Sequence, residues 1–204
     1  MVFESQKILP ALRDFRQFEQ LMKSPFEYII LLEVNIGNLK NVMLEARKYH
    51  KKVLVHADLI QGLKNDDYAA DYICNDIKPA GIISTRSNMI VKAKAKKIIA
   101  IQRTFLLDTI ALEKSYQLIE RTKPDFIEVL PGVVPHLIKE VHAKTNIPVI
   151  GGGLIRTGEE VEAALAAGAS AVTTSHRELW DDYSKIWREK NDTKIYFSTR
   201  SRHD

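Results

Sequence analysis

The sequence predicts an α/β fold, a compact (β/α)8 barrel of the TIM type in which eight parallel strands alternate with helices. Three observations support this prediction. Short β-rich runs alternate with amphipathic segments along the chain. Several of these runs are almost continuously apolar, as expected for strands that are covered by helices on one side and face a barrel core on the other. The last two runs end in glycines and in small hydroxyl residues, where barrels of this class bind phosphate.

Each predicted strand is a short apolar run that ends at turn residues or at the start of a helical pattern. Eight such runs fit into about 190 residues, so the barrel has little room for insertions. An open, doubly wound sheet is the alternative fold. In chain order the predicted strands are 7–11, 28–34, 52–57, 81–84, 98–102, 126–130, 147–150 and 170–174.

The segments between the strands carry apolar residues at a spacing of three or four, as at Leu112, Tyr116 and Ile119, which predicts amphipathic helices. Helix-capping residues stand where these helices begin, at Asn35, Asn65, Ser87 and Asp108. Thr157 and Glu160 have the spacing of a capping box, and Gly168 follows the helix that they open. The other predicted helices are 14–23, 36–50, 66–77, 88–97, 109–122, 134–144 and 178–189.

The composition is that of an ordinary soluble globular protein: 204 residues, 45% hydrophobic and 27% charged. We expect one domain over residues 1–189 and a polar, basic tail over 190–204, which is either a flexible end or an arm that docks on a partner. The only cysteine, Cys74, excludes an intramolecular disulfide and a cysteine-based zinc site. The sequence shows neither a signal peptide nor a run of the roughly 20 apolar residues that would span a membrane, so we expect a cytoplasmic protein.

The end of the seventh and eighth predicted strands forms the clearest functional pattern. Gly151, Gly152 and Gly153 allow the backbone to approach an anion, and the helix that follows has free N–H groups at its positive end. Thr174 and Ser175 supply hydroxyl groups after the next strand. These residues predict a phosphate-binding site, although three glycines also suit a plain tight turn.

Polar residues follow the other strands, where the active sites of barrels lie. Arg86 and Arg103 have the planar, forked guanidinium that pairs with phosphate. Carboxylates at the same end either accept hydrogen bonds from ligand hydroxyls or neutralise these arginines in a structural network. His56, inside an apolar strand, fits a core position better than a catalytic base. The remaining polar positions at this end are Glu33, Asn35, Asp58, Ser84, Gln102 and Glu128.

No motif in the chain fixes a catalytic reaction or a cofactor. There is no nucleophile elbow, phosphate-binding Walker loop or His-Glu-x-x-His zinc motif, and we predict no metal site. The net charge of +4 permits an anionic partner without requiring one. Two basic stretches, 47–52 and 92–97, are most simply solvated helix ends.

Six segments resemble one specific family over about residues 7–188, the glycerol uptake operon antiterminator regulatory proteins. They are ILPALRDF, HADLIQGLKNDDYAADYICNDIKPAGIISTRSN, KKIIAIQRTFLLDT, PDFIEVLPGVVP, GGGLIRT and AVTTSHRELW. The resemblance implies a bacterial cytoplasmic regulator with a TIM-like barrel and no enzymatic activity. It implies that the protein binds glycerol 3-phosphate, and then the leader mRNA of the glycerol operon, and so prevents premature termination of transcription and can stabilise the transcript.

Barrel geometry then assigns the effector site to residues of the matching motifs, together with Glu33. The phosphate is expected at Gly152, Gly153, Thr174 and Ser175. The rest of the ligand is expected at Glu33, Asp58, Ser84, Arg86 and Arg103. The phosphate would order the loops after strands seven and eight and so favour a surface that binds RNA. We assign contacts with the RNA backbone to Lys92, Lys94, Lys96 and Lys97.

Two other functions remain open from the residues alone. One is a barrel enzyme that processes a phosphosugar, for which Asp58 or Glu128 would be essential. The other is a metabolite sensor that acts through a protein partner. The sequence leaves the RNA target and the oligomeric state open, and a homo-oligomer is compatible with it.

Overall fold

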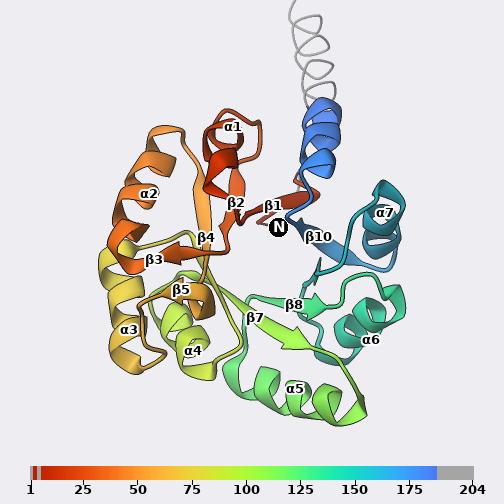
Figure 1. Cartoon of the computed structure of the whole chain (residues 1–204). Coiled ribbons are helices and arrows are strands. Elements are labelled where there is room, and N and C mark those ends of the chain that lie inside the picture. The colour runs from red at the N-terminus through yellow and green to blue at the C-terminus, as the bar shows by residue number, and fades with distance from the viewer. Residues whose placement is uncertain (1, 4–5, 188–204) are drawn as a thin grey trace, which may run out of the picture.

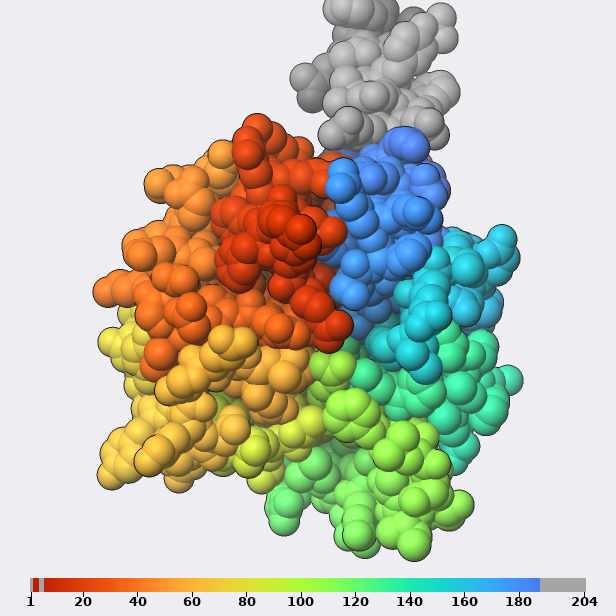
Figure 2. Space-filling model, in the orientation of Figure 1, coloured from red at the N-terminus to blue at the C-terminus, as the bar shows by residue number. Residues whose placement is uncertain are grey.

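The computed structural model describes residues 2–3 and 6–187, and it confirms the predicted barrel. Eight parallel strands form one closed sheet in the order β1-β10-β9-β8-β7-β6-β4-β2. Helices surround this sheet on the outside, in chain order (Figure 1). The first and last strands close the barrel, with Ile8 beside Val172 and Pro10 beside Thr174. The two ends of the described chain therefore lie side by side, as the red and blue surfaces in Figure 2 show.

The barrel strands match the predicted runs to within a few residues. Gly151 and Gly152 lie inside a strand, where the sequence predicted a turn. The barrel strands are β1 (Ile8–Leu12), β2 (Tyr28–Leu31), β4 (Lys52–His56), β6 (Gly81–Ser84), β7 (Ile99–Phe105), β8 (Phe126–Leu130), β9 (Val149–Gly152) and β10 (Ala169–Thr174).

Most helices begin at the predicted caps. The side chains of Asn35 and Asp108 cap their helices, and Thr157 and Glu160 form the complete capping box. The third helix is capped by Asp66 instead of Asn65, and Ser87 is the first residue of its helix and not the cap. The helices are α1 (Phe18–Met22), α2 (Ile36–Lys48), α3 (Asp67–Tyr72), α4 (Ser87–Ala95), α5 (Thr109–Thr122), α6 (Pro135–Thr145) and α7 (Gly158–Ala166), and a last helix covers 177–187 in the described part.

Apolar side chains pack on both faces of the sheet. One cluster fills the barrel and includes Leu9, Ile30, Leu54 and Ile101, and a larger one lies between the strands and the helices. Phe3 belongs to the inner cluster and packs on Tyr28 and Phe126, at the start of β2 and β8, with ring centroids 4.9 and 4.8 Å apart. These rings fill the amino end of the barrel.

Four details of the secondary structure differ from the sequence prediction. The segment 14–23 is split into a 3₁₀ turn (Phe15–Gln17) and the short α1, because Asp14 caps the turn. The segment 66–77 ends in a π-helical turn (Ile73–Ile77). Strand β7 continues three residues beyond the predicted end at Gln102 and pairs with β8 up to Phe105. A small parallel pair, β3 (Val34–Asn35) and β5 (Ile60–Gln61), lies outside the barrel sheet and was not predicted.

No helix within residues 2–3 and 6–187 is both long enough and apolar enough to span a bilayer. The predicted tail 190–204 and the end of the last predicted helix lie outside the described residues.

Candidate functional site

A cavity of about 410 Å³ opens at the carboxyl end of the barrel strands. Its walls come from the loops that follow β1, β9 and β10, and its floor includes side chains of β4, β7 and β8. Arginine and histidine side chains outnumber carboxylates in this lining. The charged and polar residues that line it are Arg13, His56, Arg103, Glu128, Arg156, Thr173, Thr174, Ser175 and His176.

The loops after β9 and β10 form one wall of this cavity. Gly153 has a φ of +75°, a conformation that other residues rarely adopt, and it turns the chain directly after β9. The Thr174 hydroxyl donates to the carbonyl of Ile155 at 3.0 Å and accepts from the backbone N–H of His176 at 3.0 Å. Thr174 therefore ties the two loops together, while Ser175 beside it is exposed.

The amino end of α7 does not offer all the free N–H groups that the sequence suggested. The Glu160 carboxylate accepts the backbone N–H of Arg156 at 2.6 Å and that of Thr157 at 3.1 Å. An internal anion thus occupies this part of the helix terminus. The side chain of Arg156 lines the cavity and adds a positive charge there.

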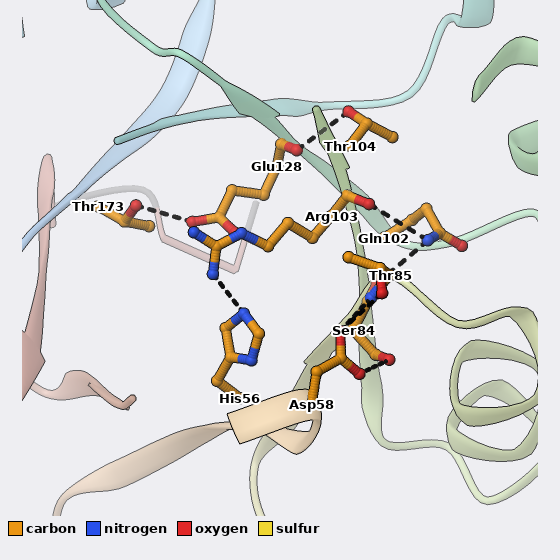
Figure 3. Close-up of polar contacts among 9 residues, drawn as sticks. All are labelled: His56, Asp58, Ser84, Thr85, Gln102, Arg103, Thr104, Glu128 and Thr173. Atoms are coloured by element: carbon orange, nitrogen blue, oxygen red, sulfur yellow. Dashed lines mark hydrogen bonds and ion pairs between the residues drawn. The ribbon is translucent and has the colours of Figure 1, made fainter. Parts of the chain in front are cut away.

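The buried side chains of His56 and Glu128 meet the partly buried Arg103 on the floor of the cavity (Figure 3). The Arg103 guanidinium donates a hydrogen bond to Nε2 of His56. Its Nε lies 3.4 Å from Oε2 of Glu128, an ion pair without hydrogen-bond geometry. The Thr173 hydroxyl donates to the other Glu128 oxygen at 2.8 Å. Arg103 is thereby fixed between β4 and β8.

Burial and neighbouring charge decide how these groups titrate. Burial, with the nearby Arg103 cation, lowers the pKa of His56 from 6.5 to about 4, so the ring is neutral at pH 7. Burial raises the pKa of Glu128, and the Arg103 guanidinium and the Thr173 hydroxyl oppose that rise. Because a neutral His56 accepts at Nε2, its proton is on Nδ1. Among the described residues Nδ1 of His56, Nε of Arg103 and Oε2 of Glu128 have no hydrogen-bond partner.

The depressed pKa of His56 predicts a pH dependence of stability. Between pH 6.5 and about 4 the unfolded chain binds a proton at this histidine that the folded chain does not, so stability falls as the pH is lowered through this window. A shift from 6.5 to about 4 corresponds to about 3 kcal/mol of stability once the pH has fallen below both values.

Urea unfolding at several pH values tests this prediction. The free energy of unfolding should depend less steeply on pH in His56→Gln than in the wild type. Since Glu128 titrates in both proteins, the difference isolates His56. The exposed His136→Gln should keep the wild-type slope, and an unchanged slope in His56→Gln would contradict the prediction.

A second polar group lies beside the cavity, at the end of β6 (Figure 3). Asp58 accepts hydrogen bonds from the Ser84 hydroxyl at 2.5 Å and from the backbone N–H of Thr85 at 2.7 Å. The Thr85 hydroxyl donates to the same carboxylate at 2.8 Å. Ser84 is fully buried, and its carbonyl accepts from the Gln102 amide at 3.1 Å. Asp58 therefore fixes the turn into α4.

The structure divides the predicted ligand residues into three groups. Gly153, Arg103, Thr174 and Ser175 line the cavity. Gly152, Asp58 and Ser84 lie outside the lining; a Cβ on Gly152 would come within 2.6 Å of Glu128 and of Thr173. The other two predicted residues are elsewhere: Arg86 is exposed at the start of α4, and Glu33 pairs with Arg13 at 3.2 Å in a neighbouring cavity.

Several cavity residues were not among the predicted ligand residues. Arg13 and Arg156 come directly after β1 and shortly after β9, in the segments ILPALRDF and GGGLIRT. His176 follows Ser175, and Thr173 faces inward from β10. Their position after strand ends was the available signal for Arg13 and Arg156. No group of three or more His, Cys, Asp or Glu side chains in the described part of the chain is placed to hold a metal ion.

Comparison with known proteins places this barrel among regulators. Residues 8–180 match the family described as glycerol-3-phosphate responsive antiterminator. The crystal structure of a glycerol uptake operon antiterminator regulatory protein from Listeria monocytogenes is 46% identical, with a TM-score of 0.87 over 89% of this chain and 98% of that one. The structure of a glycerol uptake operon antiterminator-related protein from Thermotoga maritima is 32% identical, with a TM-score of 0.75 over 85% of this chain and 97% of that one.

Two more distant similarities concern the fold in one case and the sequence in the other. Orotidine 5'-phosphate decarboxylase from Pyrococcus horikoshii has a TM-score of 0.64 at 14% identity, over 88% of this chain and 96% of that one. An uncharacterized Escherichia coli K12 protein, YgcP, is 28% identical over 88% of this chain and 94% of its own length. Because the family match covers most of the barrel, and two similar structures are named as a glycerol uptake operon antiterminator and a related protein, the chain belongs to the glycerol-3-phosphate responsive antiterminators.

Proposed function

We propose that this chain binds glycerol 3-phosphate in the cavity at the carboxyl end of the barrel, and then binds the leader mRNA of a glycerol uptake operon. Binding of the RNA prevents premature termination of transcription. The ligand acts as an effector, and it shifts the protein toward a state with higher affinity for RNA. This is the function that family membership and the chemistry of the cavity support together.

The charge of the cavity supports a phosphate ligand. Arg13, Arg103 and Arg156 line it, and Glu128 is the one carboxylate among its described lining residues. Arg103 is held by buried partners, so its position does not depend on the ligand. Gly153 and the exposed Ser175 hydroxyl lie on the wall where barrels of this class bind phosphate. We assign the phosphate to this wall, between Arg156 and Ser175.

The buried polar atoms on the floor are the observation that carries the proposal. Buried polar groups in folded proteins nearly always have hydrogen-bond partners. Here Nδ1 of His56 and Nε of Arg103 are donors, and Oε2 of Glu128 is an acceptor, each without such a partner among the described residues. These atoms are closed off from solvent, and Nε of Arg103 faces Oε2 of Glu128 at 3.4 Å, so a small polyol would satisfy them only after the floor side chains shift. Its hydroxyls both donate and accept, as these atoms require. Glycerol 3-phosphate combines such hydroxyls with the anion that the arginines attract.

One observation favours a second function, a barrel enzyme acting on a small phosphate ester. His56 and Glu128 are titratable side chains on the cavity floor, and aldolases and decarboxylases share the fold. The described lining, however, contains neither lysine nor cysteine, so it lacks the nucleophiles for Schiff-base or thiol chemistry. Incubation with glycerol 3-phosphate and related phosphate esters, followed by product analysis, tests this function. Turnover that is lost in Glu128→Gln would establish it.

Equilibrium binding to the leader RNA tests the proposed function. The affinity of the purified protein is measured with and without glycerol 3-phosphate at fixed physiological salt, with a scrambled RNA as control. A coupling of about 1–3 kcal/mol would raise the RNA affinity roughly 5- to 150-fold. Ligand binding without any effect on RNA would instead favour a sensor that acts through a protein partner.

The four lysines assigned to the RNA backbone lie at the other end of the barrel from the cavity. Lys92 and Lys94 lie in the last turn of α4, and Lys96 and Lys97 follow that helix. Strand β7 begins two residues after Lys97. Lys92 pairs with Asp71 at 2.8 Å and Lys94 with Asp125 at 2.6 Å, while Lys96 and Lys97 are exposed. We propose that Lys96 and Lys97 contribute contacts with RNA phosphates that do not depend on the effector.

This proposal predicts the salt dependence of binding. The Lys96→Met/Lys97→Met variant should weaken RNA binding equally with and without effector, and should lower the slope of log affinity against log salt by about two. The slope is obtained from titrations at several salt concentrations. An unchanged slope would remove both lysines from the interface.

A further inference from the structure

A second cavity, of about 370 Å³, lies beside the first at the carboxyl end of the barrel. Its walls come from the loop after β1, the small β3-β5 pair and the first turns of α2. Exposed side-chain amides dominate this lining, in contrast to the arginines of the first cavity. The lining residues are Arg13, Phe15, Glu33, Val34, Asn35, Asn38, Asn41, Val42 and Gln61.

The chemistry of these side chains suits an unpaired nucleobase. Amides donate and accept hydrogen bonds, as the edges of bases do, and single-stranded RNA is recognised through such edges together with stacking on aromatic rings. Asn38, Asn41 and Gln61 are exposed. Phe15 is 42% exposed, and its ring is stacked against that of Phe18 with centroids 5.9 Å apart, which holds it at the rim. A base that enters this cavity would meet an aromatic ring and amides at once.

Arg13 connects the two cavities. It lines both of them, and its Nε lies 3.2 Å from the Glu33 carboxylate in the second one. Both side chains are largely exposed, so this ion pair is weak. A phosphate in the first cavity would compete with Glu33 for Arg13. An Arg13 drawn toward the phosphate leaves the Glu33 carboxylate able to accept N–H groups of a base.

We propose that the second cavity binds an unpaired base of the RNA, and that the exchange of Arg13 between Glu33 and the effector phosphate couples this site to effector binding. This inference rests on the proposed function, because it assumes that the protein binds RNA. It separates an effector-dependent contact at the carboxyl end of the barrel from the effector-independent attraction assigned to Lys96 and Lys97.

The variant Asn38→Ala/Asn41→Ala tests the base site. Both residues are exposed on α2, and alanine favours a helix more than asparagine does, so the variant should fold. We expect wild-type affinity for glycerol 3-phosphate by calorimetry and, at saturating effector, an RNA affinity reduced about tenfold, the order expected when the hydrogen bonds to one base are lost. Phe15→Ala should act in the same direction. Gln117→Ala removes an exposed amide on α5, outside both cavities, and should bind RNA as the wild type does.

The variant Arg13→Gln tests the coupling. In this variant the RNA affinity with saturating effector should be almost the same as the RNA affinity without effector. The double asparagine variant, in contrast, should bind RNA more weakly at saturating effector. If the wild type responds to effector and the asparagine and Phe15 variants bind RNA equally well, the base site is wrong and the proposed function stands. If Arg13→Gln keeps the full effector response, the exchange is wrong. If the wild type binds no RNA in either condition, both the proposed function and this inference fail.

Discussion

Replacement of Arg103 by methionine is expected to lower the free energy of unfolding by about 3–5 kcal/mol and to abolish binding of glycerol 3-phosphate. The Glu128 side chain is only 4% exposed, and Arg103 is the one cation paired with it among the described residues. Without Arg103 the buried Glu128 carboxylate has no counter-ion. His56 also loses the hydrogen bond that Arg103 donates to it. Urea unfolding measures the first effect and calorimetry with glycerol 3-phosphate the second.

A second substitution separates the structural role of Arg103 from its role toward the ligand. Arg103→Met/Glu128→Gln removes the uncompensated charge, so most of the stability should return, while ligand binding stays lost because the cavity floor no longer presents a guanidinium to the ligand. Arg86→Met is the matched control. Arg86 is exposed at the start of α4 and outside the cavity lining, so stability should change by less than about 0.5 kcal/mol and ligand affinity should not change. Normal ligand binding by Arg103→Met would contradict the assignment of this site.

The fold could be predicted because its signals are local. Strand β2 and helix α5 are set by runs and spacings of apolar residues within one segment, and the capping box at Thr157 and Glu160 marks where α7 begins. The π-helical turn after α3 and the β3-β5 pair carry no such signal. Val34 and Ile60 pair across 26 residues of sequence, so only the closed barrel brings them together.

The site was predictable in its location but not in its contacts. Position after a strand end was enough to suggest Arg86 and Arg103 alike, and no local pattern distinguishes the two arginines. The difference arises because β7 continues to Phe105, which places Arg103 inside the sheet between β6 and β8. Glu33 was expected at the ligand for the same positional reason. Its pairing with Arg13 depends on the loop after β1, whose course the sequence did not define.

Gly152→Ala is expected to have the second large effect, a loss of about 3 kcal/mol in the free energy of unfolding together with much weaker ligand binding. A Cβ at this position would lie 2.6 Å from Oε1 of Glu128 and 2.6 Å from Oγ1 of Thr173. Both atoms belong to buried residues, and their hydrogen bond would have to break. Overpacking costs about 1–3 kcal/mol, and a lost hydrogen bond to a charged group about 1.5–3 kcal/mol. Displacement of Glu128 would also move Arg103, which ties this backbone position to the ligand.

Gly158→Ala is the matched control, because a Cβ there would meet no atom within 4 Å. Gly158 is the first residue of α7, so alanine should leave stability unchanged or raise it slightly. Thermal unfolding of both variants, with and without glycerol 3-phosphate, gives stability and ligand binding in one experiment, since a bound ligand raises the unfolding temperature. The ligand should stabilise Gly158→Ala as it does the wild type, and Gly152→Ala far less. Equal stabilisation of the two variants would show that Gly152 and its contacts with Glu128 and Thr173 do not shape the effector site.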